Sequence, residues 1–270
     1  MKIMLDIVVM MYIASVLSGL IIGSVGVVIA TSRIITLTLT ILHSVLGGGL
    51  LAIYLNSVLN LNLPVPLIST LFAIALSILV GELVEKGLHE DSSIALAISI
   101  ATTTTIFFGY LASRTSSMAL SKAWALIAGS SALVTIEDLV KLSLTFSITL
   151  PVIYVFFGEF KYIAFDEDGA KAMGLNVRLY RYLLYSLAAL SASILSSTIG
   201  ILATHVVLAV PGVLIMKIFK KLSIFYSCIM TVLVMVVGYI LAGIFNLPPS
   251  GGVGIMSLIA IAVGAFYGRS

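Results

Sequence analysis

Long apolar runs separated by short polar stretches dominate this sequence. Each run approaches twenty residues, the length at which a helix crosses a hydrocarbon core of about 30 Å. Nine membrane-spanning helices are therefore predicted, near residues 7–30, 34–55, 65–84, 93–111, 140–157, 182–199, 201–216, 222–245 and 252–267. The uncharged stretch 182–216 would extend about 52 Å as one helix, so it must turn, and Ser196–Gly200 is the expected place.

A further apolar stretch, residues 119–135, is short and has small residues in its middle. This pattern predicts a re-entrant or surface helix rather than a full span. The expected fold is an all-α, polytopic transmembrane helical bundle of about nine spans, with eight to ten as the range. The whole chain, residues 1–270, is expected to form one transmembrane domain.

Composition supports the same class. The chain is 61% hydrophobic and 9% charged, whereas a soluble domain is about 25% charged. The charged stretches are too short to form a sizeable water-soluble domain, and nothing in them indicates a nucleic-acid partner. The single cysteine, Cys228, has no partner for an intrachain disulfide.

Lysine and arginine indicate the orientation, because they favour the cytoplasmic side of a membrane. With residues 158–181 inside, nine spans place ten of the 14 Lys and Arg residues in the cytoplasm: Arg33, Lys86, Lys161, Lys171, Arg178, Arg181, Lys217, Lys220, Lys221 and Arg269. The other four, Lys2, Arg114, Lys122 and Lys141, fall outside. This bias predicts a multi-pass protein of the cell membrane with its carboxy terminus in the cytoplasm.

Most of the clustered charge lies in one loop between two apolar runs, Phe165–Val177. Acidic residues open it, an alanine-rich stretch follows and a glycine closes it: Asp166, Glu167, Asp168, Gly169, Ala170, Ala172 and Gly174. Acidic groups favour the start of a helix, and glycine commonly follows its end. The loop is therefore expected to form one short helix that projects from the membrane as a handle for a soluble partner. The alternative is an ordinary solvated connector.

Two histidines lie inside apolar runs, His43 and His205. Ionisable groups within a membrane are costly and commonly functional, and a neutral imidazole binds zinc, manganese or iron. Each is a candidate metal ligand of a transport pathway, or else a side chain that bonds a neighbouring helix backbone. His89 is expected in a solvated turn. Small and helix-breaking residues nearby are candidates for close packing or hinge bending: Gly47, Gly48, Gly49 and Pro211.

These segments, taken in order, resemble the permease subunits of ATP-driven importers for zinc, manganese and iron ions. FDEDGAKAMGLNVRLYRYLL is similar to the acidic-Ala-x-Ala-x-Gly segment of that family, and TIGILATHVVLAVPG to the stretch that follows it. HSVLGGGL, EDSSIALAIS, AGSSALVTIEDL and NLPPSGGVGIMSLIAIAV are further matches. The resemblance runs from about residue 20 to residue 266.

The resemblance implies a mechanism and a set of partners. Two copies of the permease would enclose a pathway, two ATPase subunits would dock below, and an extracellular metal-binding protein would deliver the ion. Residues 164–176 would be the cytoplasmic coupling helix. No phosphate-binding Gly-x-x-x-x-Gly-Lys-Ser/Thr motif occurs in the chain, so the permease is expected to be no enzyme and to hold no tight cofactor. ATP would bind the partner, and the metal ion would be the transported substrate.

The chain departs from the family pattern at two positions. Leu39 stands where many members have an acid one turn before the second-span histidine, and Ser99 where many have a fourth-span histidine. His205 would compensate only if the second and seventh predicted spans face each other. A permease for metal chelates such as siderophores, haem or cobalamin remains the alternative, although those chains are longer.

Two other classes are less well supported. A secondary transporter would need acids within its spans, and only Glu82 comes near. An intramembrane enzyme would need a nucleophile with its base or a metal motif, and the sequence shows neither.

Overall fold

The computed structural model describes residues 2–32, 35–129, 134–214 and 223–267, and every regular element in these ranges is a helix. The helices are α1 (Lys2–Thr31), α2 (Ile35–Leu59), α3 (Val65–Glu85), α4 (Glu90–Thr115), α5 (Ser117–Ala128), α6 (Ile136–Phe165), α7 (Glu167–Ala172), α8 (Val177–Ile199), α9 (Ile201–Leu214), α10 (Ile224–Phe245) and α11 (Pro249–Tyr267). The predicted all-α transmembrane bundle is confirmed.

Eight of these helices are long and apolar enough to cross a membrane: α1–α4, α6, α8, α10 and α11. The seventh predicted span, 201–216, corresponds to α9, whose described part has 14 residues. The last two residues of the predicted span lie outside the described ranges. The stretch predicted as re-entrant or surface helix forms the 12-residue α5. It is too short to span, as expected.

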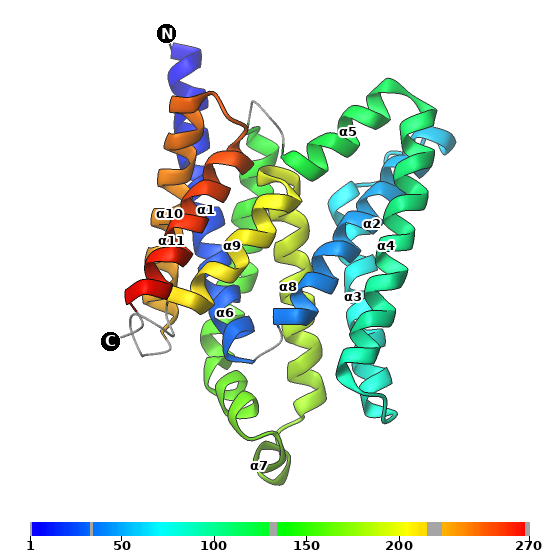
Figure 1. Cartoon of the computed structure of the whole chain (residues 1–270), viewed down its shortest axis with the longest axis vertical. Coiled ribbons are helices and arrows are strands. Elements are labelled where there is room, and N and C mark those ends of the chain that lie inside the picture. The colour runs from blue at the N-terminus through cyan, green and yellow to red at the C-terminus, as the bar shows by residue number, and fades with distance from the viewer. Residues whose placement is uncertain (1, 33–34, 130–133, 215–222, 268–270) are drawn as a thin grey trace.

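The long helices run roughly along one direction, and the short helices α5 and α7 lie near opposite ends of the bundle (Figure 1). Helix α11 ends on the α7 side, whereas the amino terminus lies at the other end (Figure 1). Helices α2, α3 and α4 pack together on one side, and α1, α6, α9, α10 and α11 form the other. Helix α8 contacts α2, α3, α6 and α9, so it joins the two sides.

Local signals explain where the helices begin and turn. Helix α6 begins four residues before the predicted span because Thr135 and Asp138 form a reciprocal capping box at its start. It bends at Phe156, whose φ of −99° and ψ of 15° leave the helical region. The turn predicted within Ser196–Gly200 is confirmed at Gly200, with φ of 85°.

Helices α1 and α10 show how the core is packed. The hydroxyl of Ser227 donates to the carbonyl of Gly23 at 2.6 Å, and that of Thr231 donates to the carbonyl of Gly19 at 2.6 Å. A Cβ built on Gly19 would lie 2.6 Å from Cα of Val232. Glycines on α1 therefore allow the backbones to approach closely, a common way of packing helices in a membrane.

Candidate functional site

The charged loop forms a shorter helix than the sequence predicted. The expected coupling helix covered residues 164–176, but α7 contains only residues 167–172, and Phe165 still belongs to α6. The chain breaks at Asp166, whose extended backbone (φ −147°, ψ 91°) ends α6. The Asp166 carboxylate then accepts a hydrogen bond from the amide of Gly169 at 2.9 Å, so the same residue ends one helix and caps the next.

Gly174 closes α7 as the sequence predicted. Its φ is +84°, a conformation that glycine adopts without steric cost. The amide of Gly174 donates to the carbonyl of Lys171, and the amide of Leu175 donates to that of Ala170, both at 3.0 Å. This pair of bonds is the Schellman arrangement that satisfies the last carbonyls of a helix.

Glu167 ties α7 to α8. One carboxylate oxygen lies 2.9 Å from Nζ of Lys171, and the other accepts a hydrogen bond from Arg181 at 3.0 Å. Burial acts to raise the pKa of Glu167, but the hydrogen bond from Lys171 and the charges of Arg181 and Lys171 outweigh it. The pKa of Glu167 therefore lies below its ordinary value. The same hydrogen bond raises the pKa of Lys171 above its ordinary value.

The remaining predicted coupling residues differ in their exposure to solvent: one is buried and two are exposed. Ala170 is fully buried, and α7 packs on α6 and α8. Ala172 is exposed, as is the side chain of Asp168. Two large apolar side chains flank the helix in an exposed state, Phe165 at 91% and Met173 at 72%. The projecting surface thus combines apolar and acidic groups.

A second group of ion pairs lies beside the first and was not predicted from the sequence. Arg178 on α8 pairs with Glu82 of α3, and its other terminal nitrogen lies 3.6 Å from Glu85. The hydroxyl of Tyr182 donates to Glu82 at 2.6 Å. These partners lie about a hundred residues apart in the sequence, so no local pattern indicates the pairing.

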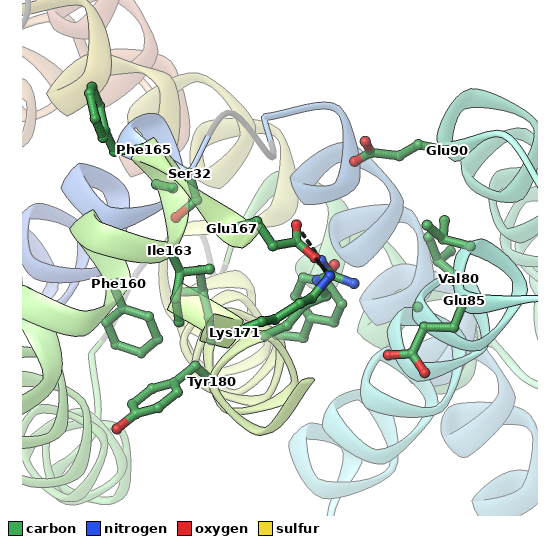
Figure 2. A pocket seen from close by; sticks show the side chains of 16 residues that line it. Ser32, Val80, Glu85, Glu90, Phe160, Ile163, Phe165, Glu167, Lys171 and Tyr180 are labelled. Carbon is green, nitrogen blue, oxygen red and sulfur yellow. Dashed lines mark hydrogen bonds and ion pairs between the residues drawn. The ribbon is translucent and has the colours of Figure 1, made fainter. Parts of the chain in front are cut away.

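The first group of ion pairs and Glu85 of the second group line a cavity of about 580 Å³ at the α7 end of the bundle. Figure 2 shows Glu167 and Lys171 meeting at one wall, with Glu85 and Glu90 across the space. The described lining combines acidic, basic and apolar side chains from α3, α4, α6, α7 and α8, together with Ser32, which follows α1.

The structure brings together the two histidines that the sequence singled out. The rings of His43 on α2 and His205 on α9 lie 5.5 Å apart between centroids and meet edge to face at 86°. Nδ1 of His43 lies 2.9 Å from the carbonyl oxygen of Leu39, and Nδ1 of His205 lies 2.8 Å from that of Ile201. Because a carbonyl only accepts, each Nδ1 carries the proton. In the neutral ring this leaves the Nε2 lone pair of both histidines free for a ligand.

The two positions at which the sequence departs from the family pattern, Leu39 and Ser99, carry neither an acid nor an imidazole. Leu39 contributes a carbonyl to His43 and no acid, and Ser99 donates its hydroxyl to Ala95 of its own helix. Among the residues that the structure describes, no group of three or more His, Cys, Asp or Glu side chains could hold a metal ion. The arrangement offers two imidazoles, enough for a passing cation and too few for a closed structural metal site.

The three glycines after His43 bring α2 close to α3, α4 and α5. A Cβ would lie 3.0 Å from the Ala101 carbonyl of α4 at Gly47, 2.7 Å from Cβ of Phe72 of α3 at Gly48, and 2.5 Å from a Leu126 methyl of α5 at Gly49. They provide room for close packing around α2. Helix α9 continues through Pro211 to Leu214, and the side chain of Pro211 lies outside the described residues.

The family model for the ABC 3 transport family matches residues 4–269. The chain belongs to this family. ABC 3 proteins are membrane permease subunits of ABC transporters, so the predicted family resemblance is confirmed. A Chlamydia muridarum relative named "probable metal transport system membrane protein" is 28% identical over 257 residues, which cover 92% of this chain and 82% of the relative.

Two solved structures share the ABC 3 chain's fold. PsaBC from Streptococcus pneumoniae, in complex with a Fab, has a TM-score of 0.78 at 22% identity, covering 94% of this chain and 89% of its own. An inward-facing transporter described as metal-chelate type has a TM-score of 0.69 at 15% identity, covering 96% and 87%. At these identities the likeness establishes the architecture alone.

Proposed function

We propose that this chain is the membrane-spanning permease subunit of an ATP-driven importer for divalent transition-metal ions. A second copy would complete the pathway, a separate ATPase would supply the energy, and an extracellular metal-binding protein would deliver the ion. The observation that supports this most directly is the ring contact of His43 and His205, whose Nδ1 atoms bond carbonyls and leave both Nε2 lone pairs for a ligand. Family membership and the name of the Chlamydia relative support the same class.

The donor set also supports a choice among metals. Imidazole suits zinc and iron, whereas manganese favours carboxylate and other oxygen ligands. Leu39 removes the acid that would serve manganese. We therefore expect Zn²⁺ or Fe²⁺ to be transported better than Mn²⁺. A two-ligand site would bind the ion weakly enough for it to leave, as transport requires.

Transport would test the histidine pair directly. Purified permease, its ATPase and the loaded binding protein would be placed in liposomes, and uptake of Zn²⁺, Fe²⁺ and Mn²⁺ would be measured. His43→Ala and His205→Ala are each expected to lower uptake at least tenfold without loss of assembly, since each removes half of the ligands. His89→Ala is the matched control, because His89 precedes α4 outside the pair. Unchanged uptake of all three metals in both pathway variants would contradict the proposal.

In this proposal α7 is the contact for the ATPase. Its exposed apolar neighbours Phe165 and Met173 and the exposed Ala172 form a small projecting surface. Ala172→Trp is expected to weaken ATPase binding and uncouple hydrolysis from uptake. Gly169 is a poorer test site, because a Cβ there would collide with the Asp166 carboxylate and disturb the helix cap itself. Ala262→Trp, an exposed position on α11, is the control, and full coupling in Ala172→Trp would exclude the docking role.

A permease for metal chelates is the second candidate, favoured by the likeness to the metal-chelate type transporter. The two candidates differ in cargo size. Stimulation of ATP hydrolysis by a binding protein loaded with bare Zn²⁺ supports the ion importer. Stimulation only by a loaded chelate supports the alternative.

A further inference from the structure

Two arginines on the first turns of α8, Arg178 and Arg181, lie between α7 and the transmembrane core. We propose that they are positioning residues that link α7 to α3 and so transmit movement of the ATPase contact to the helix carrying His43. This inference deepens the proposed function and rests on it.

The first link joins α7 to α8. Arg181 donates to Glu167 at 3.0 Å, and the side chain of Arg181 is 22% exposed, the least exposed member of these ion pairs. Ala170 is fully buried where α7 packs on α6 and α8. Because α7 has only six residues, the Glu167–Arg181 bond is expected to carry a movement of α7 to α8.

The second link joins α8 to α3 within one turn of the first. Arg178 pairs with both Glu82 and Glu85, one turn apart on α3, and Tyr182 donates to Glu82. The Tyr182 ring also packs directly on α3, since a Cβ built on Gly81 would lie 2.7 Å from its Cε1.

A third contact lies at the other end of the same two helices. The hydroxyl of Ser193 on α8 donates to the carbonyl of Pro66 on α3 at 2.7 Å. Because polar contacts join α3 and α8 at both ends, the two helices are expected to move as one rigid body.

Helix α3 in turn meets α2 beside the histidine. Gly48 and Gly49 approach Ser69 and Phe72 of α3, with Cβ positions 3.1 Å from Cα of Ser69 at Gly48 and 3.0 Å from its hydroxyl at Gly49. These glycines lie little more than one turn after His43. Packing this tight transmits displacement rather than absorbing it, so α3 movement reaches the histidine pair through α2.

The cavity of about 580 Å³ is consistent with movement passing from α7 through α8 to α3. It lies between the Glu167–Lys171 pair and the Glu85–Glu90 wall (Figure 2). Because this space separates α7 from α3, the two helices are connected through the ion pairs of α8. The space also leaves room for α7 to move.

The ion pairs are partly exposed, between 22% and 52% for the arginines, and isolated exposed pairs contribute little to stability. Their loss should therefore leave folding nearly intact while weakening the mechanical link. Mutations along connecting networks change coupling by about two- to thirtyfold. The readout must be metal uptake per ATP hydrolysed, which a purely structural role would not alter.

The test uses the complete importer in liposomes, with Arg178→Gln and Arg181→Gln. Both are expected to bind the ATPase normally and hydrolyse ATP while uptake per ATP falls about two- to thirtyfold. Lys141→Gln is the matched control, because it removes the Glu137–Lys141 pair, which joins two residues of α6 alone. A wild-type uptake-to-ATP ratio in both arginine variants would overturn the inference.

A cross-link provides the rescue. Glu82→Cys with Arg178→Cys would replace the ion pair by two thiols, which a short, reducible bifunctional methanethiosulfonate reagent can join. The native Cys228 is buried at 7% exposure, and wild-type protein treated with the reagent controls for it. Before cross-linking, uptake per ATP should fall as in Arg178→Gln; after cross-linking it should return to within about twofold of wild type, and reduction should reverse the recovery.

The outcomes separate this inference from the proposed function. If cross-linking blocks uptake, α3 and α8 must move apart, and the link is wrong while the importer stands. If wild-type protein shows no ATP-driven metal uptake, the proposed function fails and the inference with it.

Discussion

The turn between α8 and α9 offers a quantitative test of how the membrane core is built. Gly200 has φ of 85° and ψ of 153°, a region that is essentially restricted to glycine. A Cβ there would lie 2.5 Å from the carbonyl carbon of Ala128 and still nearer the amide nitrogen of Gly129, at the end of α5. Gly200→Ala therefore combines backbone strain with a collision against backbone atoms that cannot rotate away.

Each effect has an expected size. A residue held in that φ/ψ region costs about 1–3 kcal/mol, and overpacking of a closely packed site costs about 1–3 kcal/mol. The free energy of unfolding should therefore fall by about 2–6 kcal/mol, a large part of the ~5–15 kcal/mol typical of a folded protein.

Substitutions at two other glycines allow the backbone strain and the steric collision to be measured separately. Gly174 has φ of +84° with nothing within 4 Å of a built Cβ, so Gly174→Ala isolates the backbone strain. Gly243, within α10, has neither a positive φ nor a neighbour within 4 Å. Gly243→Ala should therefore be neutral or slightly stabilising.

The single cysteine makes the assay simple. Cys228 is buried on α10, so a thiol-reactive fluorescent dye reports its exposure as detergent-solubilised protein is heated. Each kcal/mol should shift the midpoint by about 2–4 °C, with Gly243→Ala highest, Gly174→Ala lower and Gly200→Ala lowest. Equal midpoints for Gly200→Ala and Gly243→Ala would refute the tight contact between α5 and this turn.

Three further predictions concern caps, charges and helix packing. Thr135→Ala should destabilise α6 by about 1 kcal/mol through loss of its cap, and Thr135→Ser should restore it in the same dye assay. Ser227→Ala should cost about 0.6 kcal/mol, the average for a hydrogen bond between helices in a membrane, and a loss above 3 kcal/mol would contradict that reasoning. The stabilisation by Glu167, whose folded pKa is depressed, should be complete above pH 4.5, its ordinary value, and fade as pH falls through the lower folded pKa. ATPase binding measured against pH should show this acid loss in wild type and lack it in Glu167→Gln. The Lys171 contribution, whose folded pKa is raised, should be complete below pH 10.5 and fade as pH rises through the higher folded pKa.

The sequence alone predicted the helical class and most spans, because burial in lipid leaves few alternatives to an apolar helix of about twenty residues. Local chemistry predicted the helix stop at Gly174, since glycine adopts its positive φ readily. The turn at Gly200 followed from length, because one helix over residues 182–216 would extend about 52 Å and a single crossing needs only about 30 Å. Element ends were less accurate. The α7 prediction was too long because Asp166 both ends α6 and caps the next helix, a double role that composition does not reveal.

The sequence also identified His43 and His205 separately, from the cost of placing imidazoles in a membrane. Only the tertiary structure decided that they face each other, because α2 and α9 are brought together by packing rather than by any pattern within either helix. The same holds for Arg178 and Glu82, which lie 96 positions apart in the sequence. Local periodicity determines what a helix is and which residues it carries. Contacts between distant segments depend on how all the helices pack at once, and those contacts assemble both the histidine pair and the charged link to α7.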